Sequence, residues 1–237
     1  MSRQLDRAIG DLSERLCLLG AIVENNLRQA VEAIETRDAR LALAVVEYDR
    51  RVDREEVDLE TECLTTLALH QPVAADLRLI VSVLKANNDL ERIGDLAVNV
   101  ARRAVHLAGH SFPGRTFDVP GMAERVQSML RRSLDSLVKR DAAQARGVLA
   151  SDDEVDRRYR QVYDQVKGVV RSDLGNVDAL IHMLSVFRHL ERVADHACNI
   201  AEDTLYLVEG EIVRHRRVTE AMGEPPDAVA ASGPCVG

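Results

Sequence analysis

The stretch LERIGDLAVNVA, residues 90–101, returns one hundred residues later as LERVADHACNIA, residues 190–201. Seven of the twelve positions are identical, and two more exchange isoleucine and valine. Both copies contain Glu-x-x-x-Asp-x-x-x-Asn, in which three oxygen-bearing side chains stand four residues apart. On an α-helix this spacing places the three side chains along one face. The repetition therefore predicts two similar helical units in one chain.

The repetition extends beyond these twelve residues. Arg37-Asp38-Ala39 returns as Arg140-Asp141-Ala142, and Asp49-x-x-Val52-Asp53-Arg54 returns as Asp152-x-x-Val155-Asp156-Arg157, both 103 residues later. The offset falls to 100 residues at the Glu-x-x-x-Asp-x-x-x-Asn segments, so the second copy has lost three residues before them. These matches predict a tandem duplication.

The duplication divides the chain into two units and a tail. The units are predicted over residues 1–110 and 118–216, with the Gly- and Pro-containing stretch at 109–121 as the linker between them. Residues 217–237 include GEPPDAVAASGPCVG, a composition typical of a disordered tail.

Each unit is predicted to contain three helices, because apolar residues recur at spacings of three and four throughout both. Asp38 is expected to cap the second helix, Pro72 to lie in the first turn of the third, and Gly109 to end it. Gly175-Asn176 is expected to separate the fifth helix from the sixth. No alternating, β-branched segment predicts a strand. The fold class is therefore all-α, with six long helices in two tandem, similar three-helix bundles.

Composition limits the function classes. The chain has 237 residues, 46% of them hydrophobic and 30% charged, and a net charge of −8, which disfavours a general role in binding nucleic acid. No uncharged run approaches the roughly 20 residues of a membrane helix, and the charged N-terminus does not resemble a signal peptide. These features predict a cytoplasmic protein.

The repeated acids are expected to face away from the core. On a helical wheel Leu90, Ile93, Ala97 and Val100 form the apolar stripe, and Glu91, Asp95 and Asn99 lie opposite; the second copy places Leu190, Val193, Ala197 and Ile200 against Glu191, Asp195 and Asn199. A second acidic pair stands on the preceding helix of each unit: Asp49 with Asp53, and Asp152 with Asp156. Because a short turn makes these helices neighbours, four carboxylates and an amide are expected to converge in each unit.

Two interpretations of this cluster stay open. Solvated helix faces often carry acids, and like charges at this spacing cost only about 0.2–0.5 kcal/mol per pair. Alternatively, an all-oxygen ligand set suits Mg²⁺, Mn²⁺ or, with bridging carboxylates, iron. A ferritin-like di-iron site is excluded, because Gly94 and Ala194 stand where Glu-x-x-His requires histidine. No nucleotide-binding, zinc-protease or serine-hydrolase motif is present.

Over about residues 5–216 the sequence resembles the PhoU family of bacterial phosphate-uptake regulators. The resemblance lies in HQPVAADLRLIVSVLKANNDLERIGDLAVNVA in the first repeat and FRHLERVADHACNIAEDTLYLVEGEIVRH in the second. It implies two similar three-helix bundles, a homodimer, and a multinuclear site in each repeat for iron, manganese or magnesium. The metal ligands that it implies are Asp49, Asp53, Glu91, Asp95, Asn99, Asp152, Asp156, Glu191, Asp195 and Asn199.

The resemblance also implies the role. When phosphate is ample, such a protein acts as a negative regulator of phosphate uptake and of phosphate-starvation signalling. Its partners would be the phosphate ABC transporter, through the ATPase subunit, and the sensor histidine kinase; the membrane would be reached only through them. We expect no catalytic activity and no nucleic-acid partner. A metal-dependent hydrolase using the same carboxylates is the alternative, and a purely structural bundle would leave the repeated acids unexplained.

Overall fold

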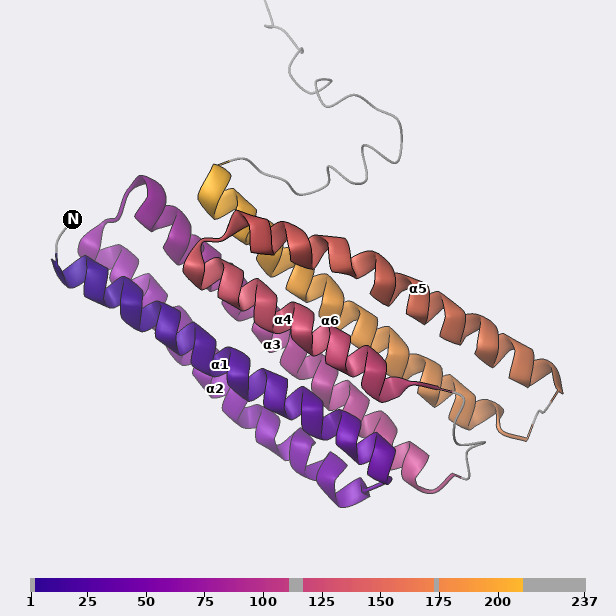
Figure 1. Ribbon diagram of the computed structural model, residues 1–237. Coiled ribbons are helices and arrows are strands. Elements are labelled where there is room, and N and C mark those ends of the chain that lie inside the picture. The colour runs from indigo at the N-terminus through magenta and orange to yellow at the C-terminus, as the bar shows by residue number, and fades with distance from the viewer. Residues whose placement is uncertain (1–2, 111–116, 173–174, 211–237) are drawn as a thin grey trace, which may run out of the picture.

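The protein is all-helical, as predicted (Figure 1). The computed structural model describes residues 3–110, 117–172 and 175–210. These ranges contain six helices and no strand: α1 (Arg3–Thr36), α2 (Ala39–His70), α3 (Ala74–Ala108), α4 (Val119–Lys139), α5 (Ala142–Ser172) and α6 (Val177–Glu209). None of the helices in these ranges combines the length and the apolar character that crossing a membrane requires. The tail expected at 217–237 lies outside the described residues.

The helices form two three-helix bundles that share one long axis (Figure 1). In the first repeat α1, α2 and α3 pack against one another, and in the second α4, α5 and α6 do the same. The repeats join mainly where α3 packs on α6, with a smaller contact between α1 and α4. Helices α3 and α6, which carry the repeated motif, therefore lie at the centre, and α2 and α5 lie on the outside.

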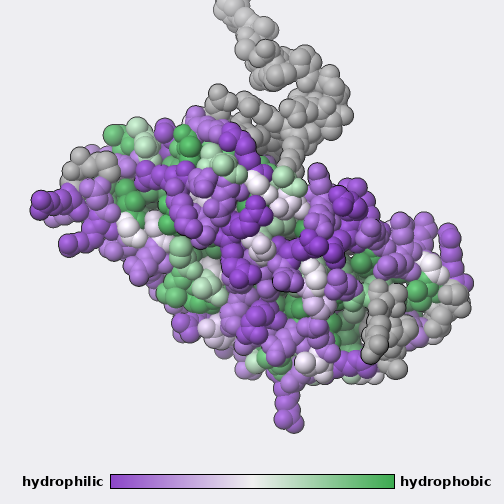
Figure 2. All heavy atoms as spheres, viewed as in Figure 1, coloured by the Kyte–Doolittle hydropathy of each residue, from purple (hydrophilic) through white to green (hydrophobic). Residues whose placement is uncertain are grey.

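The core contains the two apolar stripes that the sequence predicts. All eight residues of the stripes are fully buried: Leu90, Ile93, Ala97, Val100, Leu190, Val193, Ala197 and Ile200. The face of the molecule drawn in Figure 2 is largely hydrophilic, with scattered apolar patches. Because the core-facing stripe of each central helix is fixed, the opposite face of the same helix is directed toward α2 or α5.

The helix ends follow the predicted capping at several positions. Asp38 accepts hydrogen bonds from the backbone N–H groups of Arg40, at 2.8 Å, and Leu41, at 3.1 Å, and so caps α2. Gly109 follows the last residue of α3, and Asn176 is the N-cap of α6. Of these three residues, only Asp38 caps its helix through its side chain, because Asn176 makes no side-chain capping hydrogen bond and Gly109 bonds through its backbone N–H.

Two predicted boundaries are wrong. Pro72 precedes α3 instead of lying in its first turn, because Gln71 takes a left-handed backbone conformation (φ 46°) and Val73 stays extended before the helix starts at Ala74. The linker is also shorter than expected. Asp118 accepts a hydrogen bond from the Gly121 N–H at 2.9 Å, so the last residues of the 109–121 stretch already form the first turn of α4.

Candidate metal-ligating residues on two carboxylate rows

In the first repeat the acids of α2 and α3 face one another across a close helix contact. Asp49 lies on α2, and its Oδ1 is 3.3 Å from where a Cβ would stand on Gly94 of α3. The Cγ1 of Val52 is 3.1 Å from the same point. A glycine at position 94 therefore lets α2 approach the segment between Glu91 and Asp95 closely. We call Asp49, Asp53, Glu91 and Asp95 the first carboxylate row.

The charges of the first row act on one another. The pKa of Asp49 is raised to about 6, first by burial and then by the negative charges of Asp53, Asp95 and Glu91. Burial and the charge of Asp95 also raise the pKa of Glu91, and the neighbouring Arg92 partly offsets this. Arg92 Nε lies 3.3 Å from Glu91 Oε2, and its Nη1 lies 3.6 Å from Asp95 Oδ2. Arg92 thus offsets part of the charge of Glu91 and Asp95, and the charge of Arg102 acts in the same direction on Asp49.

The second repeat brings the equivalent acids together, and here the raised pKa values are those of Asp195 and Glu191. Burial raises the pKa of Asp195 on α6, followed by the charges of Asp152 and Asp156 on α5. The pKa of Glu191 is raised by burial and then by Asp195 and Asp156. We call Asp152, Asp156, Glu191 and Asp195 the second carboxylate row. Each predicted pair on the outer helix therefore lies within electrostatic reach of the pair on the central helix.

The two asparagines have other contacts. Asn99 Oδ1 accepts a hydrogen bond from Arg102 Nη1 at 3.5 Å, one turn along α3. Asn199 Nδ2 donates to Asp89 Oδ1 across the α3–α6 interface at 3.1 Å. The amide at the end of the second row is thus partly engaged between the repeats.

Comparison with known proteins identifies this architecture. The model of the PhoU domain matches residues 16–104 and again residues 119–204. The chain belongs to the PhoU family. A relative from Pseudomonas aeruginosa, a phosphate-specific transport system accessory protein PhoU homolog, is 36% identical over 94% of this chain and 93% of its own. A protein of the same description from Aquifex aeolicus is 36% identical over 92% of this chain and 98% of its own.

Solved PhoU structures have the same fold. The crystal structure of PhoU from Pseudomonas aeruginosa superposes with a TM-score of 0.83 at 36% identity, covering 87% of this chain and 99% of that one. The phosphate transport system regulatory protein PhoU from Streptococcus pneumoniae superposes with a TM-score of 0.81 at 25% identity, covering 88% and 99%. The tandem helical bundle is therefore the fold of the family.

The two rows suit a metal ion in their chemistry. Their donors are carboxylate oxygens, which Mg²⁺, Mn²⁺ and iron accept. Burial is the main cause of the raised pKa values of Asp49 and Asp195, and a bound cation would remove the repulsion between carboxylates that adds to it. Within residues 3–110, 117–172 and 175–210, no three Asp, Glu, His or Cys side chains converge closely enough to hold an ion. The fit thus rests on donor type and charge, and the ten ligand assignments made from the sequence stay predictions.

The polar contacts that join the repeats are not predicted from the sequence. Asp89 Oδ1 pairs with His196 Nδ1 at 2.8 Å as well as with Asn199. Lys85 Nζ forms an ion pair with the buried Asp203 at 3.1 Å. Both pairs link α3 to α6 over more than one hundred residues of sequence. The only signal for them in the sequence is a charged residue at a position that the helical period would bury.

Proposed function

We propose that this protein is a negative regulator of phosphate uptake and phosphate-starvation signalling. In this role it is a metal-binding adaptor between the phosphate ABC transporter and its sensor histidine kinase. Support comes from membership of the PhoU family and from relatives named as accessory proteins of phosphate-specific transport. A homodimer, implied by the family resemblance, is part of the same proposal.

The observation that carries the adaptor role is the pair of carboxylate rows, one between α2 and α3 and the other between α5 and α6. Each row places four acids between a central and an outer helix, at least two of them with a raised pKa. A multivalent cation held there would change an acidic face to a neutral or positive one. Such a change would control docking on a charged partner, because charge complementarity determines association rate and specificity.

A metal-dependent hydrolase is the competing proposal, because metals bound by paired carboxylates can activate water. The rows stand on helix faces, whereas an enzyme site is expected in a sheltered, concave pocket with a general acid or base. The two proposals are separated by a phosphatase assay on metal-loaded protein. Turnover that disappears in the Asp95→Ala/Asp195→Ala variant would replace the adaptor proposal with the hydrolase.

The adaptor proposal is tested by metal analysis combined with partner recovery. Protein purified without chelator is expected to contain metal, and Asp95→Ala and Asp195→Ala should each remove the metal of one repeat only. Asp153→Ala is the matched control, because it removes an exposed acid beside Asp152 that belongs to neither row. In a pull-down from membranes, the wild-type protein and Asp153→Ala should recover the kinase or the transporter ATPase, and the double variant should not.

Folding is checked separately in the metal-free variants. Asp95 is exposed and both aspartates face away from the apolar stripe, so neither substitution creates a core cavity. Partner recovery by the metal-free double variant at the wild-type level would show that the rows do not control docking.

A further inference from the structure

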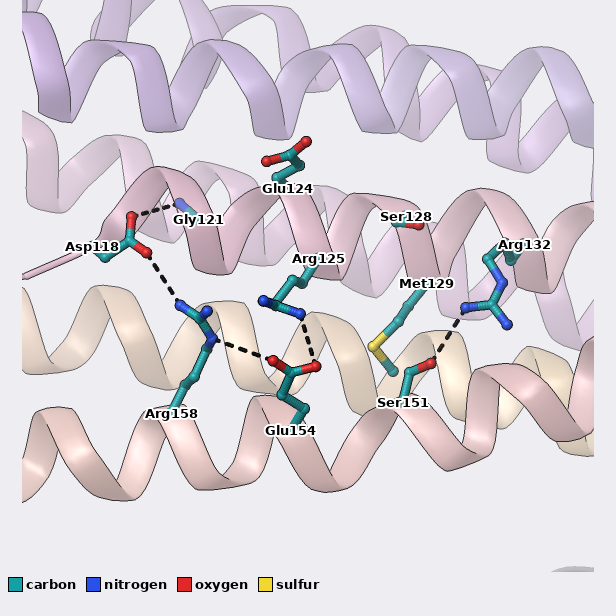
Figure 3. A pocket seen from close by; sticks show the side chains of 10 residues that line it. All are labelled: Asp118, Gly121, Glu124, Arg125, Ser128, Met129, Arg132, Ser151, Glu154 and Arg158. Carbon is teal, nitrogen blue, oxygen red and sulfur yellow. Dashed lines mark hydrogen bonds and ion pairs between the residues drawn. The ribbon is translucent and has the colours of Figure 1, made fainter.

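A polar groove between α4 and α5 lies apart from both carboxylate rows. It has a volume of ≈ 570 Å³ and is lined by ten residues of the two helices and the α4 N-cap (Figure 3). Three of the ten are arginines: Arg125, Arg132 and Arg158. Three more are acids, Asp118, Glu124 and Glu154, so the charge of the groove depends on which of these groups pair with one another.

Two of the arginines are already neutralised. Arg125 Nη1 lies 2.7 Å from Glu154 Oε2, and Arg158 Nη1 lies 3.1 Å from Asp118 Oδ2. Glu124 also lines the groove, but Figure 3 shows its carboxylate on the far side of α4 from Arg125. These two ion pairs therefore form one wall of the groove, and both carboxylates that face the groove are neutralised by them.

Arg132 differs, because no carboxylate of the described chain lies within ion-pair distance of it. Its guanidinium donates from Nη1 to Ser151 Oγ at 3.3 Å. Ser151 in turn donates to the Gly147 carbonyl at 2.8 Å, so this serine orients the arginine without balancing its charge. A half-buried cation without a counter-charge is favourable only if an anion binds it or water reaches it.

The groove is shaped around this guanidinium. A Cβ on Gly147 would lie 2.6 Å from Arg132 Nη2, so only glycine at this position of α5 leaves the guanidinium where it stands. Ser128 also lines the groove, one turn before Arg132 and one turn after Glu124 on the same face of α4. A planar, bidentate donor with an adjacent hydroxyl is the arrangement that binds tetrahedral oxyanions.

The first repeat lacks this arrangement. At an offset of 103 residues, Gln29 stands for Arg132, Tyr48 for Ser151 and Ala44 for Gly147. The arginine, the serine that holds it and the glycine that makes room for it are therefore all absent from the equivalent place. The first repeat is thus a comparison within the same chain, in which no oxyanion is expected to bind at the equivalent place.

We propose that the α4–α5 groove binds a tetrahedral oxyanion at Arg132 and Ser128, with inorganic phosphate as the first ligand. The anion site rests on the geometry of the groove alone. The choice of phosphate rests on the proposed role in phosphate transport. Sulfate and O-phosphoserine are also tetrahedral oxyanions. Sulfate distinguishes a phosphate-selective site from a general oxyanion site. O-phosphoserine distinguishes a site for free phosphate from a site for a phosphoryl group on a partner.

The test is isothermal titration calorimetry at low ionic strength on full-length, chelator-treated protein, so that no metal holds the ligand. Phosphate is expected to bind the wild type, and Arg132→Gln should bind about tenfold or more weakly, since hydrogen bonds to charged groups are among the strong ones. Gly147→Ala keeps every charge and displaces only the guanidinium, so it should weaken binding to a smaller extent. Gly168→Ala, on the same helix with open space around it, should bind as the wild type does.

Several results would overturn the proposal. The proposed anion site would be ruled out if neither phosphate nor sulfate bound the wild type. It would also be ruled out if Arg132→Gln and Gly147→Ala bound phosphate as the wild type does. Equal affinity for sulfate would overturn the choice of phosphate, and binding of O-phosphoserine alone would overturn the free ion. None of these results affects partner recovery by the carboxylate variants, so failure here is distinguishable from failure of the adaptor role.

Discussion

The two repeats keep the same helix contacts but exchange the charges that span them. In the first repeat Arg15 of α1 lies 3.7 Å from Glu55 of α2. At the equivalent positions of the second repeat, 103 residues later, Asp118 lies 3.1 Å from Arg158. An ion pair stands at both places with its signs reversed. The duplicated backbone thus fixes which positions meet, and it leaves the chemistry at those positions free to differ.

At the interface between the repeats, equivalent positions again have different chemistry. Asp89 on α3 accepts hydrogen bonds from His196 and Asn199 of α6. Its equivalent, one hundred residues later, is His189, and both ring nitrogens of His189 are buried without a hydrogen-bond partner in the described chain. Burial and nearby arginines lower the pKa of His189 to about 4. One repeat therefore supplies a paired acid to the interface, and the other supplies a neutral imidazole.

The largest expected effect tests whether the repeats are separate folding units. Leu90→Ala and Leu190→Ala remove equivalent, fully buried side chains, and each should destabilise the protein by about 2–5 kcal/mol. Because α3 packs along α6, we expect one cooperative transition for both variants. Urea unfolding followed by circular dichroism and by an engineered fluorophore in either repeat measures this. Two resolved transitions would show that the repeats unfold independently.

The next effect compares the two ends of the α3–α6 interface. Lys85→Ala leaves the buried Asp203 without its ammonium partner, and we expect a loss of about 1–3 kcal/mol. At the other end Arg103 contacts the ring of His182 at 3.2 Å, so Arg103→Ala should cost less. Adding Asp203→Asn to Lys85→Ala should recover part of the loss in urea unfolding. Equal costs for the two single substitutions would remove the distinction between the ends.

A smaller effect comes from exchanging the residues at the closest helix approach. Ala194→Gly adds backbone freedom to a helix and should cost about 1 kcal/mol. Gly94→Ala gains in helix propensity, but its Cβ would stand 3.1 Å from the buried Val52, so we expect a net loss of about 1 kcal/mol or less. Thermal unfolding of both variants measures the pair. A clear gain in stability for Gly94→Ala would mean that α2 adjusts freely at this point.

The smallest effect is a pH dependence confined to one end of the interface. Burial lowers the pKa of His182, and the neighbouring His106, Arg103 and His110 lower it further, against the opposing charge of Asp178. The folded state therefore favours the neutral ring, and stability should fall as the pH decreases from 6.5 through the lowered folded pKa. His182→Gln should show a weaker decrease than the wild type in melting temperature over this window. Parallel curves for the two proteins would show that His182 does not contribute.

The sequence by itself determined the duplication, the six helices and the face on which each acid lies. These features are local or periodic: a capping aspartate such as Asp38 acts within three residues, and an apolar stripe repeats every three or four. The carboxylate rows could be predicted for the same reason. Once the stripe through Leu90 and Ile93 is buried, Glu91 and Asp95 must lie on the opposite face.

Only the tertiary structure decided how those faces meet. The close approach of Asp49 to Gly94, the pairing of Asp89 with His196 and the space that Gly147 leaves for Arg132 all depend on the distance and rotation between helices. Helix periodicity determines the direction in which a side chain points, but it does not determine how far that side chain lies from another helix. That distance is set by the packing of the whole interface, in which the side chains of both helices fill the space together.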